Sequence, residues 1–381
     1  MARPSLSAAL PALVILGLAL AAAHANDTAI GGSGASLGPV EETRAAMRSE
    51  HIRIRLLDNG FHVSATYRLA NLLDEPLNLR IGFPEYACNP EWSDCMEGVR
   101  QAFEEMHTTV RGVTVPPVIE ETGAESPWAE DYPRLWTFAI TFAPREEVEV
   151  VHTYRVVPSM DSLGHLHMAY VVRTGANWGA PIGRAEFELD LPADTCGAGA
   201  MGVDSAAVIP WQAAPDRVSA SEDDPRPVVS GGHPLHPRRD PETGRWRMRW
   251  AYEDWVPTED FALQVVPWSA CVHHLGCPLP WLPDAPDERA AEIRGATESW
   301  SPDQLRVCRN LAWAVTGYAF TSADLREQFY ARDARAVLGE LSLPHAADPG
   351  WRDARLTPAM RAYAALLREI ERAQRGAAPL P

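Results

Sequence analysis

The chain has 381 residues, enough for two domains with sizeable cores, and a formal net charge of −17 at pH 7. Binding to the phosphate backbone of a nucleic acid needs a positively charged protein surface. Because this chain is strongly acidic, we exclude nucleic acid as a partner. The sequence contains no lysine. This excludes Gly-Lys phosphate loops, Schiff-base cofactor sites and Ser-x-x-Lys acyl-transfer dyads, and nothing else in the sequence predicts a cofactor.

The first 25 residues have the pattern of an export signal. Arg3 precedes an apolar run from Ala8 to Ala22, and Ala23-His24-Ala25 is a small-x-small cleavage site. We expect cleavage before Asn26 and a secreted or periplasmic protein, with a retained anchor as the alternative. Because no later segment is apolar enough to span a bilayer, we expect no stable membrane insertion after cleavage. The Gly-rich stretch 31–37 is predicted to be a flexible N-terminal spacer.

Six cysteines in an exported chain predict disulfides, because oxidising compartments form and keep them. Cys88 and Cys95 enclose one short loop, and Cys271 and Cys277 enclose another. We therefore expect two local bridges, Cys88–Cys95 and Cys271–Cys277.

The other two cysteines, Cys196 and Cys308, have no close neighbour in the sequence. They can pair only if the two predicted domains pack together. Since Cys308 falls on the apolar stripe of a predicted helix, a buried free thiol is the alternative.

From Glu50 to about Pro267 the chain alternates apolar and polar residues, which is typical of half-buried strands. Asp58-Asn59-Gly60 is a tight turn of the hairpin type. About ten such strands with no long helices between them predict an antiparallel β-sandwich, so the fold class is mainly β. The predicted strands are 51–57, 61–69, 77–83, 109–115, 135–142, 148–157, 167–173, 185–191, 245–252 and 261–266.

Two segments of this region depart from the strand pattern. Val99, Phe103 and Met106 recur at helical spacing, so we expect a short helix over 98–106. Residues 213–244 are rich in Pro, Ser, Asp and Gly without periodicity, which predicts a long surface loop.

A small all-α domain is predicted at the C-terminal end. Proline-rich residues follow Cys277, and beyond them the apolar period changes to 3.6. Ser301-Pro302-Asp303-Gln304 is a capping box that opens one helix, 323–330 predicts a second, and Thr357-Pro358 opens a third. We thus expect a signal peptide over 1–25, a β-sandwich over 26–277, a linker over 278–297 and a helical domain over 298–381.

The helical segment resembles the YARHG domain of exported bacterial proteins. The resemblance rests on the runs Leu305–Asn310 and Trp313–Phe320, then Ser322–Leu325 and Phe329. That family is named for a Tyr-Ala-Arg-His-Gly run, of which this chain keeps Ala314 and Gly317. The resemblance implies a helical module in an exported protein.

The N-terminal region resembles the exported family catalogued as domain of unknown function 4424. Its pieces occur in the same order as Tyr67–Asn71, Ile81–Pro84 and Thr174–Gly179. Neither family brings an established reaction, so the resemblances imply a location and an architecture.

Two groups of side chains have the residue types of a metal site. His165 and His167 lie two apart and so on one strand face, and His152 is in a preceding strand; three imidazoles would suit zinc or copper. The alternative is that they are solvated or hydrogen-bonded histidines. A second group, for which a disulfide is the alternative, is Cys271, His273, His274 and Cys277.

Catalytic frameworks are missing from the sequence, whereas aromatic residues are plentiful. There is no Gly-x-Ser-x-Gly elbow, and the acidic stretch from Glu120 to Asp131 is best interpreted as a solvated loop. Tryptophans in Pro- and Gly-rich loops offer contact area for an envelope protein or a carbohydrate, or else cover the ends of the core. These are Trp92, Trp128, Trp178 and Trp281.

The sequence therefore predicts a non-catalytic binding or interaction protein of the cell envelope. The alternative is a metal-binding protein or metal-dependent hydrolase centred on His152, His165 and His167.

Overall fold

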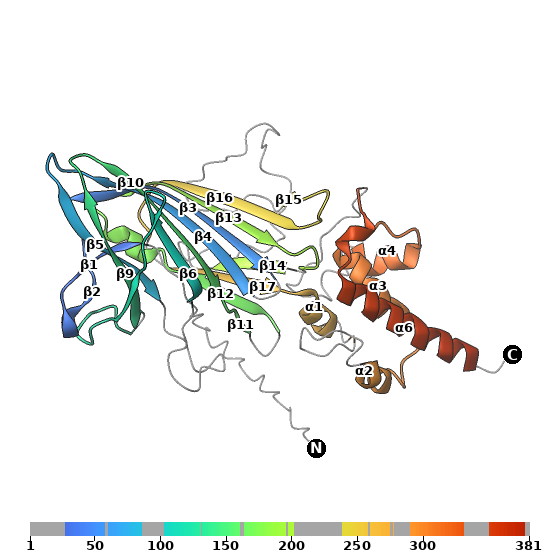
Figure 1. Ribbon diagram of the computed structural model, residues 1–381. Coiled ribbons are helices and arrows are strands. Elements are labelled where there is room, and N and C mark those ends of the chain that lie inside the picture. Colours follow the sequence, from blue (N-terminus) through green and yellow to red (C-terminus); the bar gives the residue numbers. More distant parts are fainter. Residues whose placement is uncertain are drawn as a thin grey trace, which may run out of the picture.

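Strands that alternate buried and exposed residues are the main elements in the described part of the chain, and helices gather beyond one end of the long strands (Figure 1). The computed structural model describes residues 27–57, 60–85, 103–130, 132–160, 164–195, 197–201, 238–257, 260–274, 277, 290–330 and 350–377. The predicted fold class, mainly β followed by a small helical part, is confirmed.

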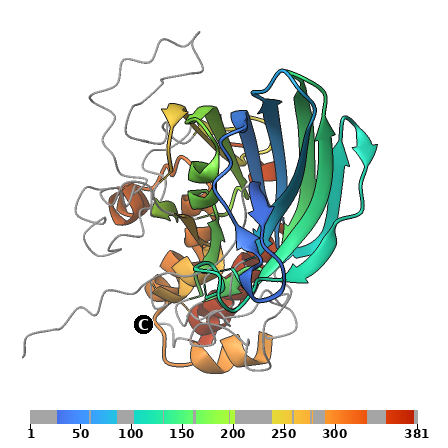
Figure 2. The same ribbon diagram turned by 90° about the vertical axis from the view of Figure 1, so that its left-hand side faces the viewer.

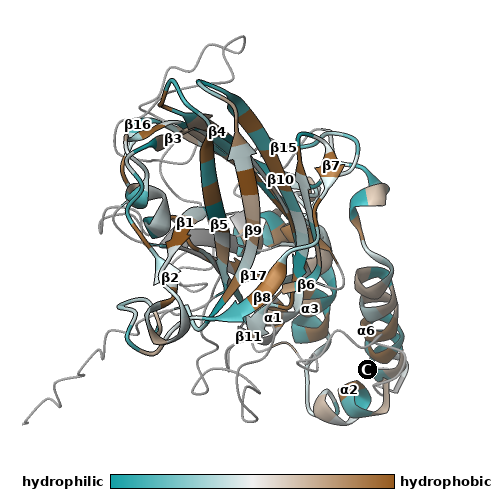
Figure 3. Ribbon diagram, turned by 60° about the vertical axis from the view of Figure 1, so that its left-hand side comes forward, coloured by the Kyte–Doolittle hydropathy of each residue, from teal (hydrophilic) through white to brown (hydrophobic). Residues whose placement is uncertain are grey.

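The largest element is a sheet of eight strands. Neighbouring strands are antiparallel except for one parallel pair, β13 with β3. The alternation that the sequence shows is visible as brown and teal bands along the strands (Figure 3). In order across the sheet, the strands are β15 (Arg238–Arg239), β16 (Trp246–Trp255), β13 (Ile182–Leu191), β3 (Ala45–Leu57), β4 (Gly60–Asn71), β10 (Glu147–Val156), β6 (Phe103–Val110) and β7 (Val113–Thr114).

Two smaller sheets cover the inner face of the large sheet. Buried side chains from all three sheets belong to a single hydrophobic cluster, as expected for a sandwich. Figure 2, turned so that the end with the five-stranded sheet faces the viewer, shows the strands in layers. The five-stranded sheet is β2 (Gly38–Pro39), β1 (Thr28–Gly31), β5 (Leu77–Glu85), β9 (Arg134–Phe142) and β8 (Val118–Glu121), and the four-stranded sheet is β11 (Ser159–Met160), β12 (Leu166–Tyr170), β17 (Phe261–Val266) and β14 (Gly197–Met201).

The helical part has its own hydrophobic cluster. The predicted capping box is confirmed: Ser301 accepts from the amide of Gln304, and the Gln304 side chain accepts from the amide of Ser301. None of the helices in the described ranges is long and apolar enough to cross a membrane. The helices are α1 (Trp268–His274), α2 (Ala290–Ala296), α3 (Pro302–Val315), α4 (Ala323–Tyr330) and α6 (Pro358–Ala377), with 3-10 turns η1 (Gly34–Ser36), η2 (Arg173–Asn177) and η3 (Asp353–Arg355).

The large sheet and the helical part pack closely together where Gly244 faces Arg355. Arg355 of η3 is buried, with 2% of its surface exposed. A Cβ atom at Gly244, in the turn between β15 and β16, would lie 2.4 Å from Cγ of Arg355. Because φ of Gly244 is also +70°, this position requires glycine on both counts.

Two predictions made for the sandwich were wrong. Residues 103–110 form strand β6 and not a helix, and 98–102 lie outside the described residues. Glu105 and Met106 both lie opposite Tyr154, which makes a β-bulge. The extra residue interrupts the two-residue period of the strand, so the apolar residues Phe103 and Met106 have a three-residue spacing that resembles a helix. The predicted spacer 31–37 instead connects β1 to β2, which pair with Gly31 opposite Gly38, and it contains the turn η1.

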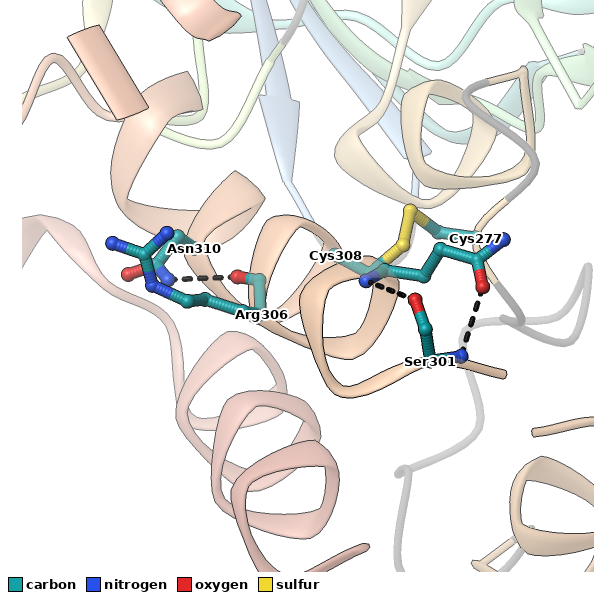
Figure 4. The surroundings of a disulfide bond; sticks show 6 residues. Cys277, Ser301, Arg306, Cys308 and Asn310 are labelled. Carbon is teal, nitrogen blue, oxygen red and sulfur yellow. Dashed lines mark hydrogen bonds between the residues drawn. A yellow bond between two sulfur atoms is a disulfide. The ribbon is translucent and has the colours of Figure 1, made fainter. Parts of the chain in front are cut away.

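The predicted Cys271–Cys277 bridge is also wrong, because Cys277 forms a disulfide with Cys308 of α3. Their Cα atoms are 5.6 Å apart, and Cys277 is buried against the helical cluster. Cys271 instead lies within α1. The disulfide therefore ties the segment after α1 to α3, close to the capping box (Figure 4). The predicted Cys88–Cys95 bridge and Cys196 lie outside the described residues.

Removing this disulfide should destabilise the helical part. The cross-link closes a loop with a sequence separation of 31 residues. By chain entropy it contributes about 3–4 kcal/mol, so we expect the double substitution Cys277→Ala and Cys308→Ala to lower the unfolding free energy by that amount. Denaturant titration followed by tryptophan fluorescence measures it. Peptide mapping without reductant that joins Cys271 to Cys277 would contradict the assignment.

Candidate functional site

The outer face of the eight-stranded sheet carries a hollow of about 300 Å³. Its side chains come from the outward positions of four adjacent strands, β3, β4, β10 and β6. The inward neighbours of the same strands, such as Ile54 and Val63, are buried in the sandwich core. The alternation of each strand therefore places polar groups around the hollow. They are Arg53, Arg55, His62, Ser64, Glu105, His107, Thr153 and Arg155.

Two carboxylates of β13 hold the arginine side of this hollow. Each forms ion pairs with two guanidinium groups, one on β3 inside the hollow and one on or next to β16. This arrangement fixes the arginines while leaving more guanidinium than carboxylate charge at that edge. The two groups are Glu188 with Arg53 (2.7 Å) and Arg249, and Asp190 with Arg55 (3.3 Å) and Arg245 (2.5 Å).

The bulge in β6 shapes the opposite side of the hollow. Glu105 has φ of 56°, a left-handed conformation that costs free energy in a residue with a Cβ. Its carboxylate lies 3.9 Å from the guanidinium of Arg155, which also pairs with Glu104. Bulges redirect side chains next to binding sites, and this one places a carboxylate at the rim.

A second polar arrangement lies inside the sandwich. Nε2 of His152 is 3.0 Å from Oδ1 of Asp27, and Nδ1 is 2.9 Å from Oγ1 of Thr108. In either tautomer one ring nitrogen donates and the other accepts, so both are hydrogen-bonded. All three residues are 0% exposed, and burial, opposed by His152, raises the pKa of the Asp27 carboxyl.

Thr108, His152 and Asp27 form a buried relay, in the order of the nucleophile, base and acid of a catalytic triad. All three are buried, so no substrate can reach the relay. Aromatic rings enclose His152, with the Phe83 centroid 4.6 Å from the imidazole centroid. The relay joins the residue before β1, in the five-stranded sheet, to β10 and β6 in the large sheet. We interpret it as a structural link between two layers of the sandwich.

The structure does not gather the predicted metal ligands into one group. His165 and His167 lie near each other, with ring centroids 6.4 Å apart, whereas His152 uses both ring nitrogens inside the core. Among the residues that the structure describes, no group of three His, Cys, Asp or Glu side chains has the arrangement of a metal site. In the second predicted group, the sulfur of Cys277 is bonded to Cys308.

Of the predicted partner-binding tryptophans, Trp178 belongs to the core. It is 4% exposed, and its indole N–H donates to the backbone oxygen of Asp27 at 3.0 Å. Trp128 is partly buried and stacks on Tyr132 with centroids 5.5 Å apart, and the Arg173 guanidinium lies 4.9 Å from the Trp128 ring centroid. Trp92 and Trp281 lie outside the described residues. The Trp178 prediction is therefore corrected, since burial removes it from any partner.

Sequence reasoning missed the hollow, although part of its pattern was present. The predicted hairpin at Gly60 fixes the pairing of Arg55 with His62 and of Arg53 with Ser64. Counting outward from that turn would have placed these four polar residues on one face. The side chains from β10 and β6 are brought beside them by pairings across long separations, which no local pattern reveals.

Comparison with protein-family models finds no match, and no curated protein matches the sequence. Among solved structures, the fold resembles that of a candidate nutrient binding protein from Legionella pneumophila subsp. pneumophila str. Philadelphia 1, with a TM-score of 0.50 and 19% identity over 91% of this chain and 100% of that chain. An aminopeptidase A from Legionella pneumophila aligns over 59% of this chain and 22% of its own, with 11% identity and a TM-score of 0.29, which is too low for any argument. The first of these two structures shows the fold alone.

The link between the layers can be tested through His152. We expect His152→Ala to lower the unfolding free energy by about 2–4 kcal/mol, because it opens a cavity and leaves Asp27 and Thr108 without their buried partner. His51→Ala is the matched control, since His51 lies half-buried on β3 and should change stability by at most about 0.5 kcal/mol. Denaturant melts measure both. Equal effects of the two substitutions would show that the relay does not link the layers.

Proposed function

We propose that this chain is an exported, non-catalytic binding protein of the cell envelope that takes a small polar ligand in the hollow on the outer face of the large sheet. The observation that carries the proposal is the division of polar groups in the sandwich. Guanidinium, imidazole, hydroxyl and carboxylate groups line a solvent-facing hollow, while His152 and its partners Asp27 and Thr108 are enclosed in the core.

Chemistry on a substrate would need an acid or base within hydrogen-bond reach of it. The relay residues Asp27, Thr108 and His152 are 0% exposed, so they serve stability. The hollow combines arginines that pair with β13 carboxylates with the side chains of His62, His107 and Glu105, and we propose that these groups bind and orient a ligand without transforming it. The resemblance in fold to a candidate nutrient binding protein agrees with this proposal.

Export is supported by the signal pattern of the first 25 residues and by the Cys277–Cys308 disulfide, which suits an oxidising compartment. The resemblance to the domain of unknown function 4424 family and to the YARHG domain, both found in exported proteins, points the same way. Together they favour a task in the cell envelope.

Binding without turnover is directly measurable. We expect at least one solute from a panel of sugars, sugar acids, sugar phosphates, amino acids and dicarboxylates to raise the melting temperature of the purified chain, because a ligand that binds only the folded state stabilises it. Mass spectrometry after incubation should recover that solute unchanged. If no solute in the panel shifts the transition, or if a bound solute is converted into product, the proposed function is wrong.

A further inference from the structure

We infer that the ligand of the hollow is a small hydroxylated oxyanion, a sugar acid or a sugar phosphate, with its anionic group over Arg55, His62 and Arg155. The inference rests on the proposed function and names the chemical class of its ligand. It follows from the register of the strands, the character of the lining and the volume of the hollow.

A row of basic side chains crosses three strands of the outer face. His62 on β4 is the direct partner of Arg55 on β3 and of Arg155 on β10. Directly opposite positions on one sheet face place Cβ atoms about 5 Å apart, so these three side chains are close enough to contact one small ligand. Carboxylates pair with both guanidinium groups, Asp190 with Arg55 and Glu104 with Arg155. Guanidinium groups bind oxyanions with two parallel hydrogen bonds, so this row is the part of the hollow that suits an anionic group.

The neighbouring row provides hydroxyl and imidazole groups beside one guanidinium, that of Arg53. Ser64 on β4 pairs with Arg53 on β3 and with Thr153 on β10, and Thr153 pairs with His107 on β6. The two rows are two residues apart along each strand, or about 7 Å. Hydroxyl and imidazole groups both donate and accept, so this row suits the alcohol groups of a polyol whose anionic end lies over the basic row.

The size and the lining of the hollow suit a small polar ligand. Tyr154 contributes to the lining, but it is 3% exposed and packs inward on Phe103 with centroids 4.6 Å apart. The groups that a ligand would meet are therefore mainly arginine, histidine, hydroxyl and carboxylate side chains. A volume of about 300 Å³ fits a monosaccharide derivative.

Glu105 at the rim limits how much negative charge the ligand carries. Its side chain is 68% exposed and lies 3.9 Å from Arg155, so a second anionic group on the ligand would meet this carboxylate. We therefore assign one oxyanionic group to the ligand. Glu105→Gln should strengthen the binding of an anion severalfold, because it removes the repulsion and keeps the shape of the side chain.

The test is isothermal titration calorimetry of the full chain with gluconate, glucose 6-phosphate, neutral glucose and inorganic phosphate. We expect gluconate or glucose 6-phosphate to bind more tightly than glucose and inorganic phosphate, with affinity that falls as salt is added. Arg55→Ala and Arg155→Ala should each weaken binding by roughly tenfold to a hundredfold, as expected for lost hydrogen bonds to a charged group.

Arg48→Ala is the matched control, because Arg48 and Arg55 both lie on β3 with 51% of their side chains exposed, and Arg48 is outside the hollow. It should leave the affinity unchanged. Arg55→Lys keeps the charge but loses the planar fork, so a weakened affinity with an unchanged melting temperature would separate recognition from folding.

The four probes also separate the outcomes. Tighter binding of gluconate assigns a carboxylate, and tighter binding of glucose 6-phosphate assigns a phosphate; both support the inference. Glucose binding as tightly as either anion, with no effect of Arg55→Ala or Arg155→Ala, would overturn the oxyanion class and leave a binding protein. If none of these probes binds while an amino acid or dicarboxylate from the wider panel does, the inference fails and the proposed function stands.

Discussion

The register of β3, β4 and β10 is the constraint on which the rest of this structure depends. Because side chains on a strand alternate between two faces, a shift of one residue would turn every inward group outward. With Leu57 opposite Gly60, the register sends Ile54 and Val63 into the core and sends Arg55 and His62 to the outer face. The core and the hollow therefore depend on the same strand registers, and a shift in register would alter both.

Polar groups in the core add specificity to this arrangement. The Asp27 carboxyl group, just before β1, is hydrogen-bonded to His152 in the large sheet. The indole N–H of Trp178 donates to the backbone oxygen of Asp27. A buried polar group costs free energy unless its partner is in place, so these bonds favour the one packing in which both layers are aligned. The N-terminal strand, which pairs with β5, thereby becomes part of the sandwich.

Local sequence patterns predicted most of the fold but little of the candidate site. The strand alternation and the capping box at Ser301 depend on neighbouring residues, and both were predictable. The bulge at Glu105 was not, because an extra residue opposite Tyr154 is set by the partner strand. The partner of Cys277 was missed for a related reason: proximity in sequence favoured Cys271, whereas α1 occupies that segment and α3 brings Cys308 to Cys277. His152 shows the limit most clearly, since a histidine on a strand can be a ligand or a core residue, and only the packing of the layers decides.

Under the function that we propose, the site lies on an open sheet face, so its affinity would come from positioned charges and not from enclosure. The carboxylates of β13 hold the β3 arginines in position before any ligand arrives, which reduces the entropy lost on binding. The most direct measurement of this account is a crystal structure of the chain with the tightest-binding solute. We predict electron density for the ligand over Arg55, His62 and Arg155, with its hydroxyl groups toward Ser64 and Thr153. Density elsewhere, such as beside Trp128 and Arg173, with an empty outer face would contradict it.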